Sequence, residues 1–127
     1  DEVLQIGAHT RSHPSLPTCS PGDLADELAG PRRELEELLG SPVKHFCYPF
    51  GDVDRRVANA TRDAGYETAV TMQPGGVGSA TDRFRLPRLY VGDWDADEFV
   101  RRLGLGDHHV RGLRPERRGG ARGVPDR

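Results

Sequence analysis

Short apolar segments alternate with helical patterns along this chain, and this alternation restricts the folds that it can adopt. Four segments have the length and composition of strands, namely residues 3–9 (VLQIGAH), 45–50 (HFCYPF), 66–71 (YETAVT) and 86–91 (LPRLYV). Strand, helix, strand units of this size favour parallel strands joined by right-handed crossovers. The sequence therefore predicts an α/β fold, layered or barrel-like.

The longest helical pattern lies between Ser20 and Gly40. Ser20 is a good N-cap, since a proline follows it and an acidic residue comes three positions later. Five leucines fall within about one 100° arc, which is typical of a helix packed on a core: Leu24, Leu28, Leu35, Leu38 and Leu39. Gly30 and Pro31 interrupt the pattern, because proline removes an amide donor. We expect a kink or two shorter helices there.

The same signals predict two further helices. One covers residues 54–64 and ends at Gly65. The other follows a glycine-rich loop and begins at Asp95, where Glu98 completes an N-terminal capping pattern. Its apolar positions are Ala96, Phe99, Val100 and Leu103.

Composition excludes some classes of protein and marks a distinct C-terminal segment. Charged residues make up 30% of the chain, and no apolar run approaches the roughly 18 residues of a membrane span. Residues 104–127 hold six arginines against three acidic residues, with many glycines and few apolar residues. We predict a disordered tail there. It has no aromatic residue for base stacking, so a nucleic-acid partner is not expected.

Two histidines follow the first predicted strand, in the segment His-Thr-Arg-Ser-His-Pro. His9 and His13 are four residues apart at a strand end, so both imidazoles can reach one metal ion. Imidazole suits zinc, and also cobalt or nickel, but a catalytic ion would need a third protein ligand and an open position for water. By spacing alone the alternative is a pair of solvated or hydrogen-bonded histidines.

The order of an apolar strand, a small residue and His-Thr-x-Ser-His-Pro resembles the second motif of the NodB-type polysaccharide deacetylases, carbohydrate esterase family four. The resemblance implies that His9 and His13 bind a divalent metal together with an aspartate from an earlier Asp-Asp motif, whose other aspartate is the general base. No Asp-Asp pair precedes His9 in this sequence. Residues 1–103 are therefore expected to be the C-terminal part of such a domain. The implied fold is a partial, distorted β/α barrel whose N-terminal strands are missing.

Residues 46–51 (FCYPFG) resemble the third motif of the family, commonly Phe-Arg-Pro-Pro-Tyr-Gly, in which the amide before the glycine helps to form an oxyanion hole. Phe50 would supply that amide, and Tyr48 is a candidate for binding substrate. The Tyr-Pro-Phe-Gly sequence is closer to the branch that acts on poly-N-acetylglucosamine or related glycans than to the chitin-type branch. The alternative is a strand that ends in a Pro-Gly turn with two core aromatics.

One position departs from the family pattern. Cys47 stands where many relatives have an arginine that orients the base aspartate, and Arg88 is a candidate replacement. The alternative for Arg88 is an ordinary surface ion pair. A histidine of the last motif acts as general acid in the family, and only His108 and His109 are left for that role. His45 is expected in a surface or supporting position.

The resemblance implies a hydrolase that removes N-acetyl groups from polysaccharide amino sugars, acts on non-peptide carbon–nitrogen bonds and releases acetate. Its cofactor would be a divalent metal, zinc first, with cobalt or nickel as alternatives. Its substrate would be an N-acetylated polysaccharide, and the family implies a cell-envelope or secreted location. Without the Asp-Asp motif, the chain is expected to be inactive alone. Two alternatives remain open, a truncated non-catalytic relative that binds glycan or metal and a structural fragment without activity.

Overall fold

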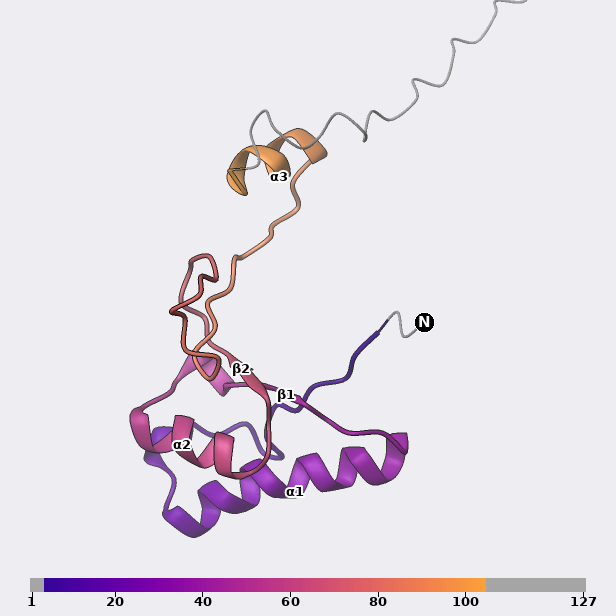
Figure 1. The fold of residues 1–127 in the computed structure, drawn as a ribbon, viewed down its shortest axis with the longest axis vertical. Coiled ribbons are helices and arrows are strands. Elements are labelled where there is room, and N and C mark those ends of the chain that lie inside the picture. Colours follow the sequence, from indigo (N-terminus) through magenta and orange to yellow (C-terminus); the bar gives the residue numbers. More distant parts are fainter. Residues whose placement is uncertain (1–3, 105–127) are drawn as a thin grey trace, which may run out of the picture. The chain divides into compact units, whose positions relative to one another are not determined.

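The computed structural model describes residues 4–104, which belong to two compact units divided between Tyr90 and Val91. The first unit contains two α-helices, two strands and two short 3-10 turns, and the described part of the second contains one helix (Figure 1). In chain order the elements are η1 (Leu16–Thr18), α1 (Pro21–Leu39), β1 (His45–Cys47), η2 (Pro49–Gly51), α2 (Arg55–Asp63), β2 (Thr68–Val70) and α3 (Ala96–Arg102). The predicted tail, with His108 and His109, lies outside the described residues apart from Gly104.

The two strands form a parallel pair, joined by the crossover helix α2. Phe46 of β1 lies opposite Ala69 of β2, and single parallel bridges continue the sheet on both sides. Ala8 pairs with Phe46, and Leu86 pairs with Val70. All four paired segments therefore run in the same direction, which confirms the predicted parallel α/β arrangement.

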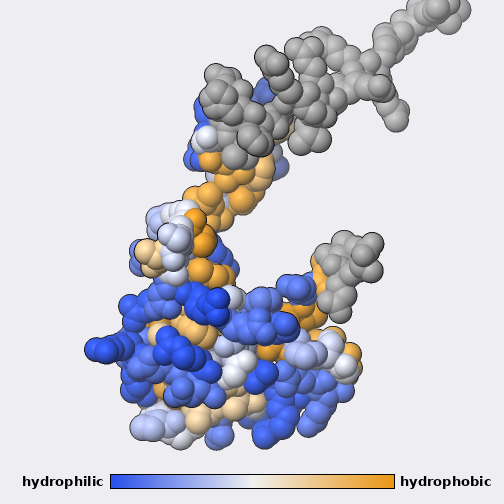
Figure 2. Space-filling model, in the orientation of Figure 1, coloured by the Kyte–Doolittle hydropathy of each residue, from blue (hydrophilic) through white to orange (hydrophobic). Residues whose placement is uncertain are grey.

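The first and last predicted strands, residues 3–9 and 86–91, are wrong as continuous strands. Each described segment forms only the one bridge at Ala8 or Leu86. Leu4 and Ile6 are 84% and 50% exposed, so the first segment is not a buried strand either. Figure 2 shows hydrophobic residues at the surface of the segment that leads from β2 to α3. The physical reason is that a strand needs partners on consecutive residues, which these segments do not find among residues 4–104.

Helix α1 begins and ends as predicted. The side chain of Ser20 accepts a hydrogen bond from the Asp23 amide at 3.2 Å, and the helix ends at Gly40, whose φ of 66° is left-handed. Of the two alternatives expected at Pro31, two shorter helices is wrong, since α1 continues through Pro31. The kink stays a prediction. The proline is buried, so its ring contributes packing on the side of the helix that faces the core. The leucine stripe also ends early, because Leu38 is 81% exposed.

The core of the first unit lies between the sheet and the helices α1 and α2, which pack against each other. Asp54 caps α2 by accepting a hydrogen bond from the Val57 amide at 2.7 Å, and Gly65 follows the helix with a φ of 90°. Both ends of α2 thus agree with the prediction. The buried apolar residues are Ala8, Leu16, Leu24, Leu28, Val43, Phe46, Tyr48, Val57, Ala58, Tyr66, Ala69 and Phe84.

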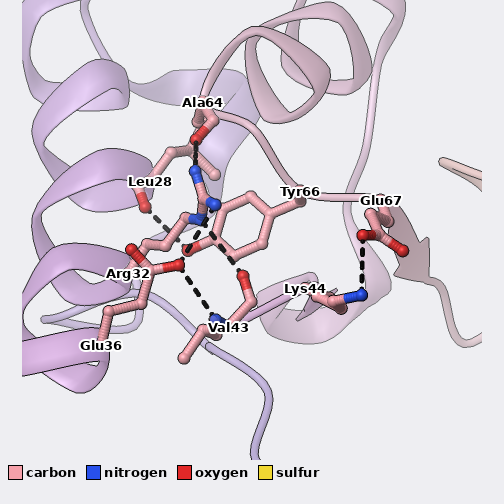
Figure 3. Close-up of polar contacts among 8 residues, drawn as sticks. All are labelled: Leu28, Arg32, Glu36, Val43, Lys44, Ala64, Tyr66 and Glu67. Carbon is pink, nitrogen blue, oxygen red and sulfur yellow. Dashed lines mark hydrogen bonds and ion pairs between the residues drawn. The ribbon is translucent and has the colours of Figure 1, made fainter. Parts of the chain in front are cut away.

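Arg32 connects α1 with the segment before β1 and with the end of α2 (Figure 3). Its guanidinium donates to the carbonyls of Val43 at 3.1 Å and Ala64 at 2.8 Å, and it pairs with Glu36 at 3.1 Å. It also lies over the ring of Tyr66, 5.7 Å from the centroid. A single side chain therefore holds three segments together beside the core.

In the second unit, Asp95 caps α3 as predicted, because its side chain accepts a hydrogen bond from the Glu98 amide at 2.8 Å. None of the residues of α3 is buried. Among residues 4–104, no helix combines the length and the apolar composition that a bilayer crossing demands.

Candidate functional site

The two histidines of the sequence motif lie side by side at the C-terminal end of the sheet. The rings of His9 and His13 meet edge to face, with centroids 4.8 Å apart and planes at 70°. His9 directly follows the bridge at Ala8, and its Nδ1 lies 2.7 Å from the carbonyl oxygen of Cys47. A carbonyl can only accept, so Nδ1 of His9 is the donor in this contact, and in a neutral imidazole Nε2 then has the free lone pair. That is the tautomer in which a histidine can ligate a metal through Nε2.

A turn between the histidines brings His13 back beside His9. Thr10 and His13 have φ values of 64° and 59°, in the left-handed region that residues with a side chain rarely adopt. The His13 amide donates to Oγ1 of Thr10 at 3.0 Å, which closes the turn. Each left-handed non-glycine residue costs on the order of 1–3 kcal/mol and persists only where its surroundings hold it.

The turn is held from outside by Glu27 of α1. Its carboxylate accepts hydrogen bonds from the amides of Arg11 at 2.7 Å and Ser12 at 3.0 Å, and from the Ser12 hydroxyl. Burial tends to raise the pKa of Glu27, but the hydrogen bonds from Ser12 and Arg11 outweigh it, so the pKa lies below its ordinary value. The ionised carboxylate is therefore the form that the turn favours. Sequence reasoning missed this residue, since no sequence pattern connects it with the histidine loop.

Phe50 lies next to the histidines, at the end of β1. The predicted strand 45–50 is shorter than expected, because β1 ends at Cys47 and the turn η2 follows. Phe50 has a left-handed φ of 59°, and its ring contacts that of His13 at a centroid distance of 4.6 Å. No described residue accepts a hydrogen bond from its backbone amide. The amide thus remains available as a donor, in a residue whose ring contacts His13.

Tyr48 occupies a different position from the one that we expected. Its side chain is only 1% exposed, and its hydroxyl donates to the carbonyl of Phe84 at 2.9 Å. Burial raises the pKa of Tyr48, which keeps the phenol protonated. Because the ring belongs to the core, this geometry does not favour the predicted contact with substrate.

Arg88 supports the loop after β2. Its Nε donates to the carbonyl of Thr71 at 2.7 Å, and its backbone amide donates to Gln73 at 2.9 Å. Within residues 4–104 it forms no ion pair. The predicted role of Arg88 beside a base aspartate therefore stays a prediction.

His45 takes part in the sheet rather than in the histidine pair. Its two ring nitrogens contact Oγ1 of Thr68 at 2.8 Å and Oε1 of Gln5 at 3.1 Å. With both nitrogens engaged, His45 has the supporting position that its sequence context indicated.

Near the turn η2, Asp52 accepts a hydrogen bond from the Ser15 hydroxyl at 2.9 Å.

In the part of the chain that the structure describes, no group of three or more histidine, cysteine, aspartate or glutamate side chains could hold a metal ion. His9 and His13 supply two nitrogen ligands of the kind that zinc prefers, and the bond from His9 to Cys47 is a typical support for such a ligand. The residues present thus fit two positions of a metal site. No third side chain of these types joins the pair among residues 4–104.

The sequence of this chain was compared with known protein families and with curated proteins. The model of the family described as "Polysaccharide deacetylase" matches residues 1–69, which is more than half of the chain and includes both histidines and Phe50. The chain belongs to the polysaccharide deacetylase family. Among curated members, it is similar to chitin deacetylase 1 of Cryptococcus neoformans var. grubii, with 38% identity over 53 residues. That alignment covers 42% of this chain and 11% of the relative.

Solved structures of polysaccharide deacetylases share the fold. A polysaccharide deacetylase from Bacillus cereus is 31% identical with a TM-score of 0.59, over 67% of this chain and 27% of that protein. A Streptococcus pyogenes deacetylase in complex with acetate has a TM-score of 0.65 at 24% identity, over 67% of this chain and 38% of that protein. The chain thus spans well under half of the length of these relatives.

Proposed function

We propose that this polysaccharide deacetylase chain is part of a metal-dependent hydrolase that removes N-acetyl groups from the amino sugars of a polysaccharide and releases acetate. One observation carries the proposal. His9 and His13 lie with their rings 4.8 Å apart, and the ring of Phe50 contacts that of His13, at the C-terminal end of parallel strands. This is the end of an α/β sheet at which catalytic groups gather.

His9 and His13 would hold the divalent ion, zinc first, with cobalt or nickel as alternatives. When bound, such an ion polarises a carbonyl oxygen and lowers the pKa of a bound water. The residues of this chain orient the ligands, since the Cys47 carbonyl fixes the ring of His9. The third ligand and the general base are left to residues outside 4–104, and the family resemblance assigns both to an Asp-Asp motif.

The Phe50 amide would donate to the oxyanion that forms when water attacks the acetamide carbonyl. A donor of this kind is typically worth about 2.7–4 kcal/mol of transition-state stabilisation. Two features support the assignment, namely the contact of the Phe50 ring with His13 and the absence of a described acceptor for this amide. The turn η2 sets the direction of the amide through the left-handed φ of Phe50.

Arg88 would support the base carboxylate in place of the arginine that Cys47 replaces. Its bond to the Thr71 carbonyl, at the end of β2, leaves the rest of the guanidinium available for a carboxylate. Arg88→Leu should therefore lower turnover more than it lowers the free energy of unfolding. Turnover and its pH profile equal to those of the wild type would assign Arg88 to the loop alone.

The sheet would continue beyond β1 and β2 into the distorted β/α barrel of the NodB type. The parallel bridges on both sides support this extension, as do the solved relatives, of which this chain covers only part. The Tyr-Pro-Phe-Gly turn favours poly-N-acetylglucosamine or a related glycan as the substrate. A cell-envelope or secreted location completes the proposal.

Acetate release from N-acetylglucosamine oligomers tests the function. We expect residues 1–127 alone to release almost none, because a missing base typically lowers the rate by about 10²–10⁴-fold. A longer chain that contains an Asp-Asp motif should show activity that depends on added zinc or cobalt. Full activity without any divalent metal would contradict the proposal. Glycan binding without turnover by the longer chain would favour a non-catalytic relative instead.

A further inference from the structure

The turn between His9 and His13 depends on a carboxylate that is distant in the sequence. Both oxygens of Glu27 are engaged, one by the amides of Arg11 and Ser12 and the other by the Ser12 hydroxyl. These two amides belong to consecutive residues directly between the histidines. The position of Glu27 therefore fixes the path of the backbone from one imidazole to the other.

Helix α1 provides space and an ion-pair partner for the side chain of Arg11, which belongs to this turn. A Cβ atom at Gly30 would lie 2.7 Å from Nη2 of Arg11, so the missing side chain makes room for the guanidinium. The same guanidinium forms an ion pair with Glu34. Glu27, Gly30 and Glu34 follow a spacing of three and four residues, which places them on one face of the helix. This face has a carboxylate at each end and no side chain at Gly30 between them. It therefore matches the amides of residues 11–12 and the guanidinium of Arg11.

The backbone of the turn needs such a support. Thr10 and His13 are both left-handed without being glycine, so local preferences oppose the conformation that brings the rings together. The bond between the His13 amide and Thr10 is internal to the turn. Among the described residues, Glu27 is the side chain from outside the turn that binds its backbone amides.

We propose that Glu27 is a positioning residue, which sets the separation of the two imidazoles by holding the amides of Arg11 and Ser12. It acts through the backbone, since its hydrogen bonds go to Arg11 and Ser12 and not to His9 or His13. Its effect on the bound ion rests on the proposed function, whereas its effect on the turn does not. Gly30 and Glu34 assist by seating the side chain of Arg11 on the same helix face.

The test compares Glu27→Gln with a matched control in the full chain of 127 residues. The amide group of glutamine keeps one acceptor oxygen but places donor hydrogens where the second oxygen had accepted. Glu37→Gln makes the same change on α1 at an exposed residue without a hydrogen bond or ion pair to a described residue. The probe is zinc ion alone, with its affinity measured by calorimetry. Denaturant unfolding and amide NMR signals are recorded on each variant.

We expect Glu27→Gln to weaken zinc binding by about 10–100-fold, the range found for residues that support metal ligands. The Arg11 and Ser12 amide signals should shift and exchange faster, and the cross-peaks between the two imidazoles should weaken. Glu37→Gln should stay within about twofold of the wild type, as expected for a surface change without a partner. Zinc affinity equal to that of Glu37→Gln, or unchanged Arg11 and Ser12 amides, would overturn the proposal.

A second variant covers the case in which Glu27→Gln does not fold. Ser12→Ala removes only the hydroxyl donor, so it should weaken zinc binding by a smaller factor and shift the same amide signals. Wild-type affinity together with wild-type Arg11 and Ser12 amide signals in Ser12→Ala would then overturn the proposal. If the wild-type chain of 127 residues binds no zinc, the third ligand is needed for binding, and the amide signals and imidazole cross-peaks alone decide the role of Glu27.

Discussion

Individual polar side chains connect segments of the first unit by binding backbone carbonyl groups. Arg32 binds the carbonyls of Val43 and Ala64, and Tyr66 donates its hydroxyl to the carbonyl of Leu28 at 2.8 Å. His9 binds the carbonyl of Cys47 in a similar way. In each case a side chain from one segment satisfies a backbone group of another, which a buried or partly buried carbonyl requires.

The histidine pair gives the first prediction at this scale. In a longer chain that contains the Asp-Asp motif, His9→Ala and His13→Ala should each abolish high-affinity zinc or cobalt binding, because one imidazole cannot form the shared site. Calorimetric titration of each variant measures the loss, with His45→Ala as the control, since both ring nitrogens of His45 have protein partners. Wild-type stoichiometry and affinity in both single variants would remove the pair from the site.

Tyr66 gives a prediction for alkaline pH. Burial raises the pKa of Tyr66 well above its ordinary value, although the nearby Arg32 lowers it in part. The folded state thus holds the proton of Tyr66 more tightly than the unfolded state does. The contribution of this proton to the free energy of unfolding is complete below the unfolded pKa of about 10 and declines as the pH rises further. Tyr66→Phe should lower stability at neutral pH by about 0.5–1.5 kcal/mol.

Urea unfolding at a series of pH values tests the Tyr66 prediction. The variant should lose less of its remaining stability above about pH 10 than the wild type does. Tyr48, whose pKa is also raised by burial, contributes equally to both proteins. Parallel stability curves for the variant and the wild type would contradict the role of Tyr66.

At the scale of the elements, local signals predicted the helices better than the strands. Ser20, Asp54 and Asp95 cap their helices as expected, because capping depends on residues within one turn. The extent of a strand depends on partners that are distant in the chain, so residues 3–9 and 86–91 could not be judged locally. Pro31 lies inside α1 and is buried, and neither fact could be judged from the local sequence.

The leucine stripe of α1 allows a matched test of packing. Leu28 is fully buried, whereas Leu38, ten residues later on the same helix, is 81% exposed. Leu28→Ala should lower the free energy of unfolding by about 2–5 kcal/mol, because it removes core contacts and leaves a cavity. Leu38→Ala should change it by no more than about 0.5 kcal/mol. Chemical denaturation measures both, and similar losses would mean that the last turn of α1 is covered in solution.

For the molecule as a whole, the candidate site and the core lie within the first unit, residues 1–90. The histidine motif and the Phe50 turn could be predicted because each is continuous in the sequence. Glu27 could not, since its partners are backbone amides 15 and 16 residues away that carry no sequence signal. The position of Tyr48 depended on the carbonyl of Phe84, 36 residues later.

This organisation predicts that a chain ending at Tyr90 keeps the metal site. Every contact of His9, His13 and Glu27 described above is made within residues 1–90. Zinc affinity should therefore stay within about threefold of that of residues 1–127, as expected when no ligand or supporting residue is removed. Calorimetry on both chains provides the comparison. A much larger loss would show that residues after Tyr90 contribute to the site.

The left-handed residues have a consequence for directed evolution. Within residues 4–104, the non-glycine residues with positive φ are Thr10, His13 and Phe50, and all three belong to the candidate site. Glycine adopts this conformation without a steric penalty, so a library selected only for heat resistance should enrich Thr10→Gly and Phe50→Gly. The first change removes the hydroxyl that closes the turn, and the second removes the ring that packs on His13. Selection for heat resistance alone would thus dismantle the site, and a catalytic screen applied in parallel would be needed to preserve it.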